Sequence, residues 1–285
     1  MGDCGAENPL GVVLPSPEKY SPEVLYPIPR APARESIGMR ADLQMFGFDL
    51  WQAFELSWLS EEGKPQVAFA EFEFPSDSPS IIESKSLKLY LNSLNHERFA
   101  TSEVVADLIC RDLSNACGSA VQVFLRGLDD YRRELSSESS ADIRPCESLD
   151  AYPLLRIVSV VDESLLQSER RSREEAGRED CVVSDLFRSN CPVTNQPDWA
   201  SVVIRYTGVD IDPSSLLSYL CSYRAHQGYH EECAERIFKA ISERCEPDSL
   251  FVAMNYLRRG GLDINVYRSS ERISRADRIR RSVRQ

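Results

Sequence analysis

The spacing of apolar residues predicts an antiparallel sheet in the first half of the chain. Between about residues 43 and 93 the pattern has a period of two: LWQAFELSWL and QVAFAEFEF, separated by SEEGKP, predict two strands joined by a hairpin turn. Leu87, Leu89 and Leu91 alternate with Lys88 and Tyr90, so SKSLKLYLN predicts a third strand.

The pattern then changes to helical spacing. Thr101 and Ser102 are suited to cap a helix, and Gly118 is suited to end it; its apolar face would comprise Val104, Val105, Leu108, Ile109 and Leu113. VQVFL returns to strand, and YPLLRIVSVV predicts the last strand of this half.

The second half, from about residue 180, repeats this mixture. ASVVIRYTG predicts a strand, and Asp212 followed by Pro213 predicts the start of a helix. A further helix is expected after Gly228, with an apolar face made of Cys233, Ala234, Ile237, Phe238, Ile241 and Cys245. SLFVAMNYL and LDINVY predict two strands around the turn Arg258-Arg259-Gly260-Gly261.

The elements together predict an α+β fold in which antiparallel sheets carry helices packed on one face. Residues 1–40 hold seven of the sixteen prolines and predict an extended N-terminal arm. The expected divisions are a first domain at 41–162, a charged linker at 163–180, a second domain at 181–270 and a basic C-terminal tail at 271–285. No GxGxxG motif occurs, so a Rossmann domain is not expected.

Composition narrows the function classes. A net charge of −12 argues against a nucleic-acid-binding protein, although nine arginines lie between Arg258 and Gln285. No apolar run is long enough to cross a bilayer and no secretory signal is evident, so a cytoplasmic protein without a membrane partner is expected. Nine cysteines without a CxxC spacing predict no zinc site and, in a reducing compartment, no structural disulfide.

One segment has the composition of a nucleophile loop. NCPVTNQPDW holds Cys191 among prolines without strand or helix period, and Asp198 precedes the strand that follows. A thiolate adds to an electrophilic carbon, and a nearby carboxylic acid delivers a proton. Taken alone, the segment favours a buried inert cysteine and a strand-capping aspartate over a catalytic pair.

Two further segments carry charged residues at positions that could bind a ligand. Lys85 and Lys88 would face opposite sides of a regular strand, but a bulge or the strand's start would bring both toward a phosphate; otherwise they are solvated. His230 and Glu231 lie at a helix start, where acids also serve as caps. A carboxylate there could accept the two parallel N–H groups of a guanine edge.

The segments ESKSLKLY, NCPVTNQPDW, HEECAERIF and RRGGLDIN together resemble the 7-cyano-7-deazaguanine reductase (QueF) family in its long tandem form. Their order and spacing match from about residue 40 to 270. The resemblance implies two tandem tunnelling-fold (T-fold) domains, the first with the signature motif and the second with the catalytic cysteine, and a homodimer.

The resemblance also implies residue roles. Cys191 would attack the nitrile of 7-cyano-7-deazaguanine to form a thioimide, and Asp198 would donate a proton. Substrate contacts would come from Ile82, Glu83, Ser84, His230 and Glu231, and NADPH contacts from Ser84, Lys85, Lys88, Arg259 and Gly260. The product would be 7-aminomethyl-7-deazaguanine, a precursor of the tRNA base queuosine. No metal is expected, because His96, His226 and His230 suggest no metal site.

Two other functions remain open. A thiol nitrile hydrolase would use the same cysteine without a dinucleotide, which the paired lysines and the RRGG turn disfavour. A non-catalytic purine-binding T-fold protein would need neither Cys191 nor Asp198, and the chain holds both.

Overall fold

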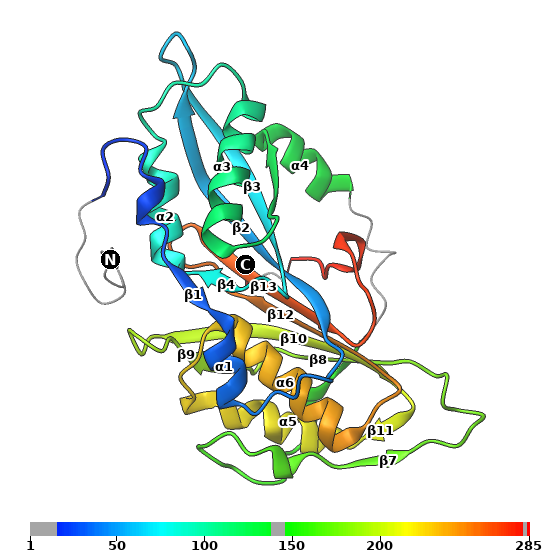
Figure 1. The fold of residues 1–285 in the computed structure, drawn as a ribbon. Helices are drawn as coiled ribbons and strands as arrows, with labels where there is room; N and C mark the ends of the chain where they lie inside the picture. The colour runs from blue at the N-terminus through cyan, green and yellow to red at the C-terminus, as the bar shows by residue number, and fades with distance from the viewer. Residues whose placement is uncertain (1–15, 138–145, 282–283) are drawn as a thin grey trace. The chain divides into compact units, whose positions relative to one another are not determined.

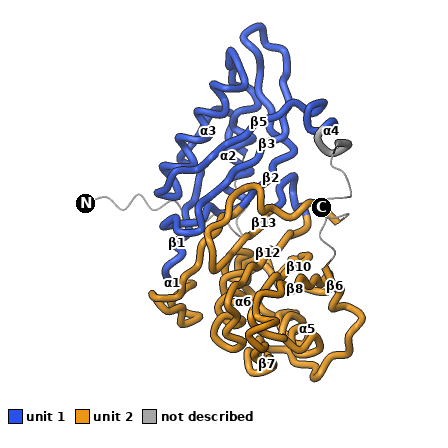
Figure 2. The backbone as a smooth tube through the Cα atoms, turned by 90° about the vertical axis from the view of Figure 1, so that its right-hand side faces the viewer, with its two compact units in different colours: residues 1–32, 50–141, 258–263 blue, residues 33–49, 142–257, 264–285 orange. Residues whose placement is uncertain are grey.

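The protein forms two compact units whose residues are interleaved along the chain. The computed structural model describes residues 16–137, 146–281 and 284–285 (Figure 1). Among them, unit 1 comprises residues 16–32, 50–137 and 258–263, and unit 2 comprises residues 33–49, 146–257, 264–281 and 284–285 (Figure 2). The turn that connects the last two strands therefore belongs to unit 1, although most of both strands belongs to unit 2.

Unit 1 contains the predicted hairpin. It is formed by β2 (Phe46–Leu59), which enters the unit at Leu50, and β3 (Pro65–Pro75). β5 (Gln122–Arg126) pairs antiparallel with β3, with Phe69 opposite Arg126. β3 is buried on both faces, because Phe69, Ala70, Glu71 and Phe72 are each at most 1% exposed. The short strands β1 (Pro27–Pro29) and β4 (Ser80–Ile82) form a separate antiparallel pair.

The predicted helix after Thr101 is confirmed as α3 (Ser102–Cys117). The Thr101 hydroxyl accepts a hydrogen bond from the backbone N–H of Val104, and Gly118 ends the helix with a left-handed φ of 76°. α3 packs against β5 and β4, and α4 (Leu128–Ser137) packs against β3 (Figure 1).

The predicted third strand is wrong: its residues form α2 (Ser84–Ser93). Buried Leu87, Tyr90, Leu91 and Leu94 recur at helical spacing, whereas Leu89, which suggested alternation, is only half-buried. The Glu83 carboxylate caps the helix by accepting hydrogen bonds from the N–H groups of Lys85 and Ser86 at 2.8 and 2.7 Å. The helical period and this cap together override the local alternation.

Unit 2 contains an antiparallel sheet in the order β13 (Leu262–Ser269), β12 (Ser249–Tyr256), β10 (Pro197–Thr207) and β8 (Asp180–Ser184). β13 enters this unit at Ile264. β6 (Glu147–Ser148) adds a parallel pair to β8, and β9 (Arg188–Asn190) pairs with the start of β10. β7 (Ser168–Arg170) and β11 (Val209–Ile211) form a small antiparallel pair.

Two helices pack against the unit 2 sheet and confirm the prediction for this region. They are α5 (Pro213–Cys221), capped by the Asp212 carboxylate, and α6 (His230–Cys245), which packs on β12 (Figure 1). The α6 residues Cys233, Ala234, Ile237, Phe238 and Ile241 are fully buried. An α+β fold with antiparallel strands is thus confirmed.

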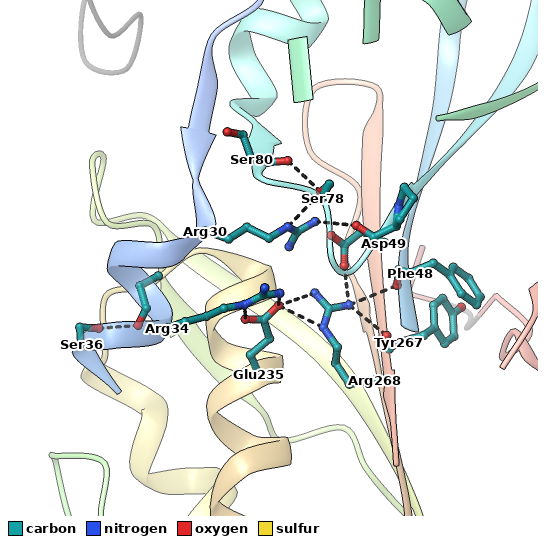
Figure 3. A network of polar contacts seen from close by, with 12 residues as sticks. Arg30, Arg34, Ser36, Phe48, Asp49, Ser78, Ser80, Glu235, Tyr267 and Arg268 are labelled. Carbon is teal, nitrogen blue, oxygen red and sulfur yellow. Dashed lines mark hydrogen bonds and ion pairs between the residues drawn. The ribbon is translucent and has the colours of Figure 1, made fainter. Parts of the chain in front are cut away.

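A buried charge network lies within unit 2. The guanidinium of Arg268, which is fully buried, contacts Asp49 at 2.7 Å and Glu235 at 2.9 Å. Arg34, on α1 (Arg30–Ser36), binds the same Glu235 carboxylate with two hydrogen bonds of 2.8 Å (Figure 3). Buried ions are tolerated when they are paired in this way, so the network joins β2, β13, α1 and α6.

The segment 152–161, the cysteines and the N-terminal arm bear on three further sequence predictions. Residues 152–161 were expected to form a strand, but they are irregular, and Ile157 is 88% exposed. A Cys146–Cys181 disulfide lies in unit 2, so the expectation of no structural disulfide is wrong. Residues 1–15 of the predicted arm lie outside the described residues, and the rest of the arm includes β1 and α1.

The described part of the 271–285 tail includes a single-turn 3₁₀ helix at Arg275–Asp277. Among the described residues, no helix is long and apolar enough to span a membrane.

Candidate functional site

Cys191 lies at the start of the loop that joins β9 to β10. The strand register places Asn190 opposite Pro197 and Ser189 opposite Asp198, so Cys191 immediately follows the last strand pair. The loop is closed by hydrogen bonds from the Cys191 N–H to the Gln196 carbonyl, 2.8 Å, and from the Asn195 N–H to the Cys191 carbonyl, 3.0 Å. The thiol is free and half-buried, as a nucleophile that must meet a substrate requires.

The Cys191 loop is bound to the segment that leads into α6. The Asn190 N–H donates to the His226 carbonyl at 2.8 Å, and the Gly228 N–H donates to the Asn190 carbonyl at 3.1 Å. The Gln227 amide donates to the Asn195 side chain at 3.0 Å. These bonds fix the position of the cysteine loop relative to the first turn of α6, because both parts belong to unit 2.

Asp198 faces that first turn. Its side chain is 4% exposed, and its Oδ2 atom lies 3.6 Å from the Nε2 atom of His230. Glu231, the next residue of α6, is also buried, at 4% exposure. The structure therefore brings Asp198, His230 and Glu231 together beside the Cys191 loop, as sequence analysis expected for one part of the site.

Tyr256 of β12 is a residue of this site that the sequence analysis missed. Its ring lies 3.9 Å from the ring of His230, and its hydroxyl lies 3.5 Å from the His230 carbonyl. The pKa of Tyr256 is held well above its usual value. Burial is the main cause, followed by the neighbouring Cys233, Asp198 and Glu231. Tyr256 is therefore a neutral phenol at physiological pH. The only sequence signal was its place in a predicted strand, within a sheet expected to carry helices on one face.

Cys233 is a second thiol close to this region, with a different character. It is fully buried on α6, and burial together with the Glu232 carboxylate raises its pKa to about 12. A thiol with this pKa remains protonated at neutral pH and is a poor nucleophile. Cys191 is thus the better candidate for covalent chemistry.

The remaining predicted site residues belong to unit 1. Ile82 ends β4 and is 2% exposed, Glu83 caps α2, and Ser84 and Lys85 begin that helix. Burial raises the pKa of Glu83, although its hydrogen bonds from the Lys85 and Ser86 N–H groups act in the opposite direction. Glu83 is therefore a helix cap in this structure, whatever further contact it makes.

Lys85 and Lys88 lie three residues apart on α2, so the helix places them on neighbouring positions of one face. The Lys88 ammonium lies 3.6 Å from the Glu55 carboxylate. It also lies next to the RRGG turn, because a Cβ added at Gly260 would approach it to 3.0 Å. Because this segment is a helix and not a strand, both lysines lie on one side without a bulge.

The RRGG turn is closed by reciprocal backbone hydrogen bonds between Arg259 and Leu262, of 2.8 and 3.2 Å. Gly260 and Gly261 have φ values of 58° and 81°, which a two-residue hairpin turn requires and which side chains resist. The Phe54 N–H donates to the Gly261 carbonyl at 3.0 Å, so the turn is held to β2 within unit 1. Arg259 and Lys85 therefore belong to the same unit.

A separate cavity of about 730 Å³ lies elsewhere in unit 2 and contains none of the predicted site residues. Carboxylates dominate its lining: Glu147, Glu169, Asp180, Asp210 and Asp212, against a single Arg178. Such a lining repels phosphate, so this cavity is not the cofactor site. In the described part of the chain, no group of three or more histidine, cysteine or acidic side chains is arranged to hold a metal ion.

Comparison with known proteins shows which family the chain resembles. Residues 16–125 match the family described as "Nitrile reductase, 7-cyano-7-deazaguanine-reductase N-term", and residues 197–275 match "QueF-like protein". A structure titled as the apo form of the archaeosine synthase QueF-Like covers 38% of this chain and 96% of its own, at 18% identity and a TM-score of 0.29. That likeness is too weak to bear on the fold.

Two relatives named NADPH-dependent 7-cyano-7-deazaguanine reductase are similar over almost the whole chain. The protein from Burkholderia multivorans is 47% identical over 263 residues, covering 92% of this chain and 93% of its own. The protein from Burkholderia vietnamiensis is 46% identical over 273 residues, covering 96% and 97%. On these grounds, the chain belongs to the NADPH-dependent 7-cyano-7-deazaguanine reductase family.

Proposed function

We propose that this protein reduces the nitrile of 7-cyano-7-deazaguanine to an aminomethyl group with NADPH, by way of a covalent thioimide on Cys191. The observation that carries the proposal is the half-buried Cys191 on a hydrogen-bonded loop, beside the buried carboxyl groups of Asp198 and Glu231 and the half-buried His230. Membership of the reductase family supports the reaction and the cofactor.

The cysteine makes the nitrile easier to reduce. A nitrile is a poor hydride acceptor; addition of the Cys191 thiolate to its carbon forms a C–S bond and moves an electron pair to nitrogen, which takes up a proton. The resulting thioimide is a better acceptor. After the first reduction the C–S bond breaks, which returns the thiolate of Cys191 and leaves an imine for the second reduction. We assign that proton transfer to Asp198, whose buried carboxyl group lies at the end of the Cys191 loop.

The first turn of α6 is suited to hold the base. The Glu231 carboxylate offers two acceptors to the two parallel N–H groups of the guanine-like edge. His230 is held against the ring of Tyr256 at 3.9 Å, which restricts its orientation. We assign both residues to substrate binding, together with Ile82, Glu83 and Ser84 of unit 1.

The residues of unit 1 fit an anionic dinucleotide. Lys85 and Lys88 share a helix face, and Gly260 gives the turn beside Lys88 a backbone that a ligand can approach closely. We therefore assign Ser84, Lys85, Lys88, Arg259 and Gly260 to NADPH, with Lys88 exchanging its Glu55 partner for phosphate. When bound, NADPH supplies the hydrides, two per nitrile.

Further parts of the proposal follow from the family. We propose that residues 41–162 and 181–270 are tandem T-fold domains, that the protein is a cytoplasmic homodimer, and that its product enters queuosine synthesis. Neither a metal nor direct nucleic-acid binding is required for this chemistry.

The test combines a variant with two measurements. Cys191→Ala is expected to abolish both NADPH consumption and the substrate adduct seen by intact mass, while Cys110→Ala, which removes another half-buried free thiol, retains both. An adduct that persists on Cys191→Ala would overturn the assignment. In the wild type, an adduct that turns over without NADPH would instead indicate a nitrile hydrolase, and binding without an adduct would indicate a purine-binding protein.

A further inference from the structure

Three arginines of unit 2 converge on one indole ring. The guanidinium carbons of Arg188, Arg224 and Arg284 lie 5.9, 5.5 and 5.7 Å from the ring centroid of Trp199. They come from β9, from the 3₁₀ turn Ser222–Ala225 that follows α5, and from the C-terminal tail. Segments far apart in the sequence thus bring three positive charges to a single half-buried aromatic side chain.

This arginine cluster is distinct from the Cys191 site, although it shares the same hairpin. The register places Arg188 opposite Trp199 and Ser189 opposite Asp198. Because successive side chains of a strand point to opposite faces, Trp199 and Arg188 lie on the face away from Asp198. The cluster also lies in unit 2, whereas the lysines assigned to NADPH lie in unit 1.

Two of the three arginines in the cluster lack a carboxylate partner among the described residues. Among the described residues, neither Arg188 nor Arg224 forms an ion pair with a carboxylate, and the buried Nε atom of Arg188 has no hydrogen-bond partner. Arg188 donates instead to the neutral Asn190 side chain at 3.1 Å. The Arg284 guanidinium donates to the Asp185 backbone carbonyl at 2.7 Å and lies 3.9 Å from the Asp185 carboxylate, which is 56% exposed. Like charges gathered in this way are unfavourable without an anion.

We propose that the arginine cluster is a binding site for a phosphate or pyrophosphate group, either free or carried by a nucleotide. Guanidinium groups bind phosphate oxygens through paired hydrogen bonds, and the buried Nε–H of Arg188 is a donor without a protein acceptor. Trp199 adds an aromatic surface against which arginines stack. The inference is independent of the reductase proposal, since it uses none of the residues assigned to that reaction.

Trp199 provides the measurement. The other two tryptophans, Trp51 and Trp58, are buried at 2% and 5% exposure in unit 1, so an anion at the cluster should change the fluorescence of Trp199 alone. Inorganic pyrophosphate and, separately, 2′,5′-ADP are titrated without deazaguanine, with sodium chloride keeping the ionic strength constant. A saturable change is expected in the wild type and should be absent in Trp199→Phe.

Arg224→Gln tests the charge requirement, because this exposed side chain can be neutralised without disturbing the hairpin. Losing one charge-assisted contact is expected to weaken binding about tenfold. Arg173→Gln, an exposed arginine of unit 2 outside the cluster, should leave the affinity unchanged. Tighter binding of 2′,5′-ADP than of pyrophosphate would identify a nucleotide as the source of the phosphate, and the reverse would identify a free anion.

Three results would overturn the proposal. These are no saturable signal with either anion, the same signal with chloride alone, or equal weakening by Arg224→Gln and Arg173→Gln. Because none of these measurements involves nitrile reduction, failure here is separable from failure of the reductase proposal.

Discussion

The imidazole of His230 lies 3.6 Å from the carboxylate of Asp198, measured from Nε2 to Oδ2. This separation is too long for a strong hydrogen bond, so the two groups interact mainly through charge when the imidazole is protonated. Both groups are held in position. Asp198 is held by the pairing of β9 with β10, and His230 by its contact with the ring of Tyr256. The site is thus a set of positioned groups beside the Cys191 loop.

Asp198→Asn is expected to slow nitrile reduction while leaving substrate binding nearly intact. An amide cannot supply the proton, and general acid–base catalysis is worth roughly 10²–10⁴-fold. Single-turnover kinetics measure the rate, and calorimetry measures binding. Asp107→Asn, on the exposed surface of α3, is the control. Wild-type turnover by Asp198→Asn at every pH would show that another group is the acid.

Glu231→Gln is expected to weaken deazaguanine binding, because an amide presents one acceptor and one donor to a base edge with two donors. The mismatch leaves a buried polar group unpaired, at a cost of about 1–3 kcal/mol. Glu232→Gln removes a charge from the same helical turn and controls for the helix dipole. Calorimetry should separate the two variants; equal affinities would contradict recognition by the Glu231 carboxylate.

Much of the architecture was predictable from the sequence because it depends on local signals. Helix caps act within one turn, so they can be read from the sequence. Thr101 and Gly118 mark the two ends of α3, and Asp212 with Pro213 marks the start of α5. The Cys191 segment was identified as a loop from its prolines and missing periodicity. The family resemblance then assigned roles that no local pattern could supply.

The predictions failed where distant contacts decide the structure. At Ser84–Ser93, the burial of Leu87, Tyr90 and Leu91 in the fold favours a helix over the strand that the leucine alternation indicated, and the Glu83 cap is a local signal that the prediction overlooked. In the apolar segment at 152–161, the Leu155 N–H donates to the hydroxyl of Ser218, and the Asp162 N–H that follows donates to Ser222. Neither contact is visible in the local pattern.

The α2 geometry makes a prediction for cofactor use. Lys85→Ala and Arg259→Ala should each raise the KM for NADPH more than that for the deazaguanine. In the wild type, higher salt should also raise the KM for NADPH, since exposed charges are screened over about 8–10 Å at physiological ionic strength. Lys64→Ala, at the exposed hairpin turn of unit 1, is the matched control. Equal use of NADH and NADPH would remove these residues from the cofactor site.

The buried network around Arg268 makes a prediction for stability. Arg268→Ala removes the buried guanidinium that contacts Asp49 at 2.7 Å and Glu235 at 2.9 Å (Figure 3). Removing one partner of a buried ion pair typically costs about 3–5 kcal/mol. Urea denaturation should show this loss in the free energy of unfolding, and Arg173→Ala should show almost none. A loss below 1 kcal/mol would mean that water or another cation replaces the guanidinium.

The two thiols near the first turn of α6 should differ sharply in reactivity. Burial, followed by the Glu232 carboxylate, raises the pKa of Cys233 to about 12, so its thiolate becomes abundant only as the pH approaches that value. Cys191 is half-buried on its loop and open to reagents. Iodoacetamide at pH 8 is therefore expected to modify Cys191 and to spare Cys233 in the folded protein, as measured by peptide mass spectrometry.

Substrate provides the decisive control for this experiment. Because the proposed adduct occupies the Cys191 sulfur, preincubation with 7-cyano-7-deazaguanine without NADPH should protect Cys191 from alkylation. Cys110, a free and half-buried thiol on α3 in unit 1, should be modified at the same rate with or without substrate. In urea, Cys233 should react as readily as the others, because its raised pKa depends on burial. Modification of Cys233 before Cys191 in the folded protein would mean that the first turn of α6 opens, and the rigid site inferred from the loop contacts would be wrong.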